Sequence, residues 1–150
     1  MEFSQDSGLH ILENPPDAAV EYDFPIKSCK YAISNKLYYS IIAVHGLAAN
    51  PVHTWIKKVP NPDNKGYTEI LWLKHLLPVK VPKARILKYN YATGHLVDAP
   101  KESLRSIASR LVHLIHVLRK EDPKASQRPI IFIGHSFGGV VIVDVCFYLP

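Results

Sequence analysis

A length of 150 residues corresponds to about one domain, and 47% hydrophobic with 21% charged residues is the composition of a globular protein rather than a disordered one. Two cysteines, Cys29 and Cys146, are too few for a disulfide-stapled scaffold, and their separation argues against a zinc site. No apolar run reaches the roughly 18 residues that span a bilayer. Residues 1–23 have neither the basic start nor the continuous apolar stretch of a signal peptide, so we expect an intracellular protein.

The net charge of +5 is unevenly distributed along the chain. The first 26 residues contain six acidic residues and no lysine or arginine, so the remainder carries a charge of +11. The positive charge of residues 27–150 can attract phospholipid surfaces or nucleic acid. The simpler interpretation of this charge is a set of scattered, solvated lysines. Because the chain has no dense basic block and no aromatic-interleaved pattern, we expect no nucleic-acid binding and leave a weak association with membrane surfaces open.

The first third of the chain predicts a leader followed by strands. Residues 1–24 form a polar, acidic segment that we expect to be disordered, separated from a folded domain over residues 25–150. Two short extended candidates follow at residues 26–33 and 37–39. The continuous apolar run at residues 41–44 then predicts a strand that is buried on both faces.

The middle of the chain predicts a loop, a helix, a strand and a longer helix. We expect a proline-rich loop over residues 49–65, a helix over residues 68–77 that Pro78 ends, and a strand over residues 85–91. A second helix starts near Ala99, with Asp98 as N-cap and Pro100 in the first turn. Its apolar residues share one face: Leu104, Ile107, Ala108, Leu111, Ile115 and Leu118.

The last segment predicts a strand over residues 129–133 and a buried helix over residues 140–149, although its β-branched residues also suit a strand. Strands therefore alternate with helices along the chain. This order predicts the α/β class, with a mostly parallel sheet covered by helices on both faces.

The motif that points to chemistry is Gly134-His135-Ser136-Phe137-Gly138-Gly139, between the last strand and the last helix. A GxSxG sequence in that position is typical of a nucleophile elbow, a tight turn that holds the serine in a strained conformation. Gly134 and Gly138 would supply the necessary space, and we expect Gly139 to allow close packing of helix on strand. The alternative is a glycine-rich turn with a helix-capping serine.

A serine nucleophile also needs hydrogen-bond donors for the oxyanion and a base for its proton. The backbone N–H groups of Phe137 and Leu47 are the predicted donors, with His45 and Gly46 completing the loop that follows the strand at residues 41–44. Because that loop contributes through its backbone, we expect His45 to be a packed structural histidine.

Four segments together resemble the lipase-like branch of the α/β-hydrolases. They are residues 41–55 (IIAVHGLAANPVHTW), 72–78 (WLKHLLP), 84–92 (ARILKYNYA) and 128–141 (RPIIFIGHSFGGVV). Within that branch the chain is most similar to the serine-active-site-containing protein and to the fungal hydrolase domains that precede NACHT or ankyrin modules. The resemblance implies ester or lipid substrates, no cofactor, and an association with mitochondrial or endoplasmic reticulum membranes. Ala48-Ala49 depart from the glycines that relatives often carry there.

The resemblance covers only the N-terminal part of such a domain, so the predicted fold is an incomplete α/β-hydrolase. In that family an acid and then a histidine follow the serine along the chain. Only Asp144 follows Ser136, on the helix after the elbow, and no histidine does. His95 is the one loop histidine near the expected mouth of the active site, and it is a weak candidate for a substitute base. His113 and His116 suit a helix surface better than a metal site.

We therefore expect that this chain alone does not turn over esters efficiently. Two hypotheses remain open: a serine hydrolase of the lipase or esterase type, and a hydrolase-like fragment that binds a partner without catalysis. Labelling of Ser136 by a fluorophosphonate would separate them. A nucleotide-binding domain is disfavoured because the chain has neither GxGxxG after its first strand nor a phosphate-binding P-loop sequence.

Overall fold

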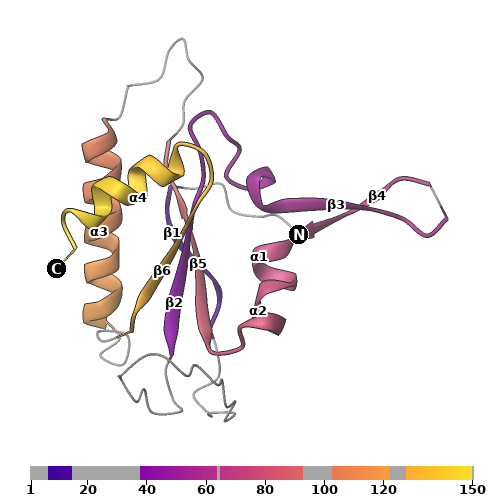
Figure 1. The fold of residues 1–150 in the computed structure, drawn as a ribbon, viewed down its shortest axis with the longest axis horizontal. Helices are drawn as coiled ribbons and strands as arrows, with labels where there is room; N and C mark the ends of the chain where they lie inside the picture. Colours follow the sequence, from indigo (N-terminus) through magenta and orange to yellow (C-terminus); the bar gives the residue numbers. More distant parts are fainter. Residues whose placement is uncertain (1–6, 15–37, 64, 93–102, 122–127, 150) are drawn as a thin grey trace, which may run out of the picture.

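The computed structural model describes residues 7–14, 38–63, 65–92, 103–121 and 128–149. Its centre is a four-stranded sheet in the order β1-β5-β2-β6 (Figure 1). The strands are β1 (Gly8–Glu13), β2 (Tyr39–Val44), β5 (Ala84–Asn90) and β6 (Ile130–Gly134). β2 pairs in parallel with both β5 and β6, whereas β1 runs antiparallel to β5. The predicted mostly parallel sheet is confirmed.

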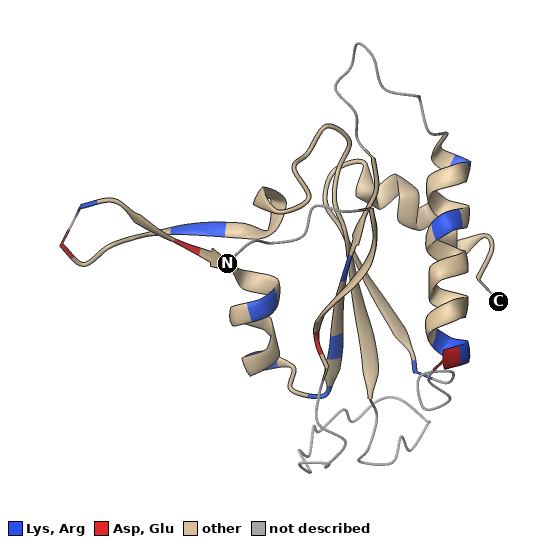
Figure 2. Ribbon diagram, turned by 180° about the vertical axis from the view of Figure 1, so that it is seen from behind, with Lys and Arg blue, Asp and Glu red and all other residues tan. Residues whose placement is uncertain are grey.

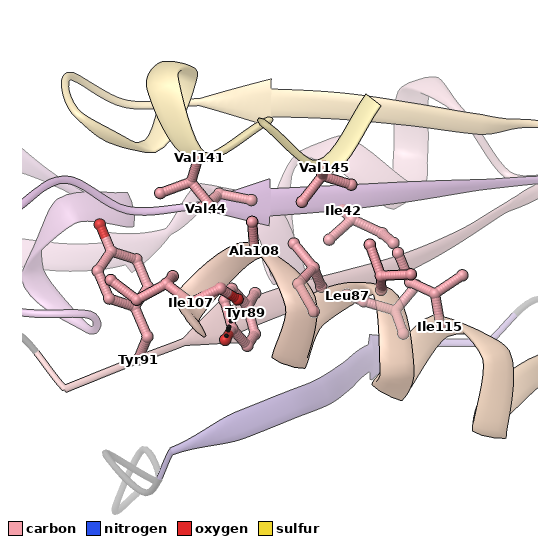
Figure 3. Close-up of a cluster of buried hydrophobic side chains, with 12 residues drawn as sticks. Ile42, Val44, Leu87, Tyr89, Tyr91, Ile107, Ala108, Ile115, Val141 and Val145 are labelled. Carbon is pink, nitrogen blue, oxygen red and sulfur yellow. Dashed lines mark hydrogen bonds between the residues drawn. The ribbon is translucent and has the colours of Figure 1, made fainter. Parts of the chain in front are cut away.

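Helices cover the two faces of this sheet. The alternation of side chains along β2 sends Ile42 and Val44 to one face and Ile41 and Ala43 to the other. On the first face, α3 (Leu104–Glu121) and α4 (Gly138–Cys146) close a core with Leu87 of β5 (Figure 3). The core on the second face is closed by residues from the segment between β2 and β5: Trp55, Leu71 and Leu73.

Helix α3 follows the predicted apolar face. Ile107, Ala108, Leu111 and Ile115 are buried, and the half-buried Leu104 and Leu118 pack against the same core. The hydroxyl of Ser103 accepts a hydrogen bond of 3.1 Å from the N–H of Ser106, so Ser103 caps the described helix. The proposed cap and first turn at Asp98 and Pro100 lie outside the described residues.

The segment between residues 53 and 80 differs from the prediction. It contains a 3₁₀ turn, η1 (His53–Trp55), then β3 (Ile56–Pro60) and β4 (Tyr67–Leu71), then two short helices, α1 (Trp72–His75) and α2 (Leu77–Lys80). β3 and β4 form an antiparallel hairpin, so the loop predicted over residues 49–65 is wrong at residues 56–60, and the start of the helix predicted over residues 68–77 is wrong as well.

Two local features explain the differences from the predicted helix. Tyr67, Thr68 and Ile70 have the aromatic and β-branched side chains that suit a pleated strand. Pro78 lies in the first turn of α2, where a missing N–H costs nothing, instead of ending a helix.

Two further predictions are corrected, and a third lies outside the described residues. Residues 8–13 belong to β1, so the expectation of a disordered leader is wrong for them, because Leu9 and Leu12 each pack against one of the two cores. The helix predicted as buried over residues 140–149 is α4, but only one side of it is buried. The extended candidate at residues 26–33 lies outside the described residues. In the described chain, no helix is long and apolar enough to cross a membrane.

Candidate active site around Ser136

Ser136 lies in the turn that joins β6 to α4. Its φ of +53° is in the left-handed region, which a residue with a Cβ atom rarely adopts. The N–H of Gly138 donates to the carbonyl of His135, and the N–H of Gly139 donates to the carbonyl of Ser136, both at 2.9 Å. Ser136 is exposed, so its hydroxyl stands at the surface on a strained, hydrogen-bonded turn after a strand of the central sheet.

Two glycines of the motif are required by the space around them. A Cβ atom on Gly138 would lie 2.1 Å from the carbonyl oxygen of Val44, and one on Gly134 would lie 2.7 Å from the nitrogen of Gly139. A Cβ atom on Gly139 would meet nothing within 4 Å. The prediction that Gly139 allows close packing of helix on strand is therefore wrong. The positions that must lack a side chain are Gly134 and Gly138.

The loop after β2 lies against this turn, because β2 and β6 are parallel neighbours whose ends meet at one edge of the sheet. A Cβ atom on Gly46 would lie 3.0 Å from the Cβ of Ser136. Ala48 also has a left-handed φ, of +54°, and so marks a sharp bend in this loop. Within the described residues, the N–H groups of Leu47 and Phe137 donate to no hydrogen bond.

His45 is completely buried under this loop. Its Nδ1 donates to the carbonyl of Gly46 at 2.9 Å, and its Nε2 accepts the N–H of Tyr91 at 3.3 Å, which makes the ring a neutral Nδ1–H tautomer. Burial lowers the pKa of His45, and the nearby charge of Lys88 adds to this effect against the opposing bond to Gly46. These contacts give His45 a structural role in the loop.

Tyr91, the residue that follows β5, fixes the same loop, and the sequence alone did not single it out. Its ring stacks on His45 with 4.4 Å between the centroids, and its hydroxyl donates to the carbonyl of His45 at 2.8 Å. Burial raises the pKa of Tyr91 to about 12, so the hydroxyl remains a donor at neutral pH. Its position just after a strand that pairs with β2 was the available signal.

The imidazole of the exposed His135 contacts Trp55 edge to face, with 6.3 Å between the ring centroids. Trp55 is buried and also meets Trp72 edge to face. The base of the hairpin therefore packs against the residue that precedes Ser136, a contact that links the second core to the turn at Ser136.

The remaining predicted residues lie apart from Ser136. No described residue forms a hydrogen bond with the Ser136 side chain. Asp144 is half-buried on α4, and its Oδ2 has no partner among the described atoms. His113 and His116 are exposed on α3, and the described residues contain no group of three His, Cys, Asp or Glu side chains suited to a metal. His95 lies outside the described residues.

Comparison of the chain with protein-family models, with curated proteins and with solved structures finds no match in any of the three.

Proposed function

We propose that this chain carries the nucleophile and the oxyanion site of a serine hydrolase of the lipase or esterase type, on the N-terminal part of an α/β-hydrolase fold. The left-handed φ of Ser136, at the turn from a parallel strand into a helix, is the observation that carries this proposal. In a nucleophile elbow the sharp turn between strand and helix forces the serine into this strained conformation and so exposes its hydroxyl above the sheet. A capping serine needs no such conformation, and α4 has no side-chain cap bond.

The reaction that suits this arrangement is acyl transfer from a carboxylic ester. The Ser136 Oγ attacks the ester carbonyl and its proton passes to a base, forming a tetrahedral intermediate whose collapse expels the alcohol and leaves an acyl-enzyme. The N–H groups of Leu47 and Phe137 would stabilise the oxyanion, because they flank Ser136 and are not used elsewhere in the described chain. The proposal assigns no base. The exposed Leu47 side chain suits a lipid-like substrate.

Labelling with a fluorophosphonate tests this proposal, because that reagent mimics an ester and phosphonylates activated serines. We expect labelling of the folded chain that is lost in Ser136→Ala and retained in Ser109→Ala, a substitution at an exposed serine of α3. Circular dichroism of each variant checks that the fold persists. Labelling that is absent from the folded chain, or unchanged in Ser136→Ala, would overturn the proposal and favour a non-catalytic binding module.

A further inference from the structure

The hairpin β3–β4 together with α1 and α2, here called the basic arm, carries an excess of positive charge. Between residues 56 and 83, a range that adds Lys83 just after α2, the sequence holds six lysines, no arginine and two acidic residues, a net charge of +4 out of the +11 on residues 27–150. Figure 2 shows lysines on β3 and α1. Five of the six are exposed: Lys57, Lys58, Lys65, Lys74 and Lys80. Lys58 forms an ion pair with Glu69 at 3.4 Å.

The hairpin projects from the body of the protein, with α1 at its base (Figures 1 and 2). A two-stranded hairpin without a covering element is marginally stable in water. Its outer end carries Tyr67, whose side chain is 66% exposed. A projecting ribbon with an exposed aromatic residue is suited to contact a surface that lies outside the fold.

Large apolar side chains accompany the lysines on the helices of the arm. Leu76, which lies between α1 and α2, and Val79 of α2 are 46% and 76% exposed. The exposed Lys80 follows Val79 directly in the chain. Exposed aliphatic residues bordered by lysines are typical of segments that lie in the membrane interface, where the apolar groups enter and the ammonium groups remain among the headgroups.

We propose that the basic arm docks the protein on an anionic lipid surface. The charge is complementary, since lysine ammonium groups near a membrane surface are attracted by the negative potential of anionic headgroups. A nucleic acid fits less well: the arm has no arginine for bidentate phosphate contacts, and Leu76 and Val79 would stay in water on a phosphate backbone. The proposal does not depend on catalysis by Ser136.

Vesicle sedimentation with the full chain tests this surface. We expect binding to vesicles of phosphatidylcholine with added phosphatidylserine, little binding to phosphatidylcholine alone, and release at high salt. The double variant Lys57→Glu and Lys80→Glu should weaken partitioning by roughly 30-fold or more, from the loss of two lysine contacts alone. Val79→Ser should weaken it less and should leave the salt dependence in place.

The matched control is Arg105→Glu with Lys120→Glu, two exposed residues of α3 on the opposite face of the sheet. Both double variants change the net charge equally, so the control should retain most of the binding. Equal losses in the two variants would show a general charge effect and overturn the proposal. Absence of vesicle binding, or binding of a single-stranded RNA in its place, would overturn it as well. Circular dichroism of every variant confirms folding.

Discussion

At the scale of single residues, the turn around Ser136 depends on atoms that approach more closely than a side chain permits. The position of a Cβ on Gly138 overlaps backbone oxygens of both Val44 and His45, and backbone cannot move away as a flexible side chain can. The GxSxG spacing identified this turn because its chemistry is local to six residues. The roles of Gly138 and Gly139 could not be separated in the same way, since the difference depends on the neighbouring strand β2.

Alanine substitutions at these adjacent glycines should therefore have opposite effects. Gly138→Ala should lower the free energy of unfolding by about 3 kcal/mol or more, because the new methyl group cannot be accommodated. Gly139→Ala should raise it by about 0.5–1 kcal/mol, since the site is open and helical. Urea denaturation of the two variants measures both values, and similar effects from both substitutions would contradict the geometry of the turn.

His45 should make the stability of the protein depend on pH. Its pKa in the folded state is lowered from 6.5 by burial, so below pH 6.5 the unfolded chain binds a proton that the folded protein does not. Stability should fall as the pH drops from 6.5 toward the lowered pKa, by at most about 1.4 kcal/mol per pH unit from this group. Urea denaturation between about pH 8 and pH 5 should show the slope reduced in His45→Gln and kept in His53→Gln. An unchanged slope in His45→Gln would refute this assignment.

At the scale of elements, local patterns predicted some structures well and missed others. The apolar stripe of α3 and the continuous apolar run of β2 were predictable because the spacing of the apolar residues within each element indicates which side chains are buried. β1 was missed because its identity depends on pairing with β5, more than 70 residues away in the sequence. The β3–β4 hairpin was missed because the residues of β3 lie among prolines that predicted a loop, and most of β4 lies in the segment assigned to a helix; only the cross-strand pairing shows the two strands.

Ser103 should stabilise the first turn of α3 through its side-chain oxygen. Ser103→Ala removes the acceptor for the N–H of Ser106 and should lower the free energy of unfolding by about 1 kcal/mol. Ser109→Ala, at an exposed site inside the same helix, should instead raise it by a few tenths of a kcal/mol. Thermal unfolding of the two variants compares their stabilities. A Ser103→Ala variant as stable as the unsubstituted protein would show that Ser103 is not the cap of α3.

β6 is an edge strand of the described sheet, since it pairs only with β2 there, and Ile131 on it is 49% exposed. Unpaired apolar edges favour association between chains. Ile131→Lys should reduce light scattering at high protein concentration while leaving the unfolding transition nearly unchanged. Val117→Lys, at an exposed position on α3, should reduce scattering much less, and an equal effect of the two would argue against association through the edge.

At the scale of the whole molecule, the parallel pairing of β2 with β6 sets Gly46 beside Ser136, although 90 residues separate them. The proximity of Leu47 and Phe137 to Ser136 could be predicted, because they belong to the backbone at the ends of two adjacent strands. Their role as oxyanion donors stays a prediction. The chain spacing predicts no base or acid for Ser136, because such groups would meet a serine through tertiary structure. The whole account therefore depends on whether this arrangement activates one particular hydroxyl.

The rate of phosphonylation of Ser136 relative to Ser109 in the same folded chain measures that activation most directly. Both serines are exposed, so Ser109 reports the reactivity of an ordinary hydroxyl. Removing one oxyanion donor costs an enzyme roughly 10² to 10³ in rate, so two such donors beside Ser136 should speed the attack of its hydroxyl even where no triad base is assigned. Mass spectrometry of the labelled peptides should therefore show Ser136 reacting on the order of 10³ times faster than Ser109. Equal rates at the two serines would contradict the account.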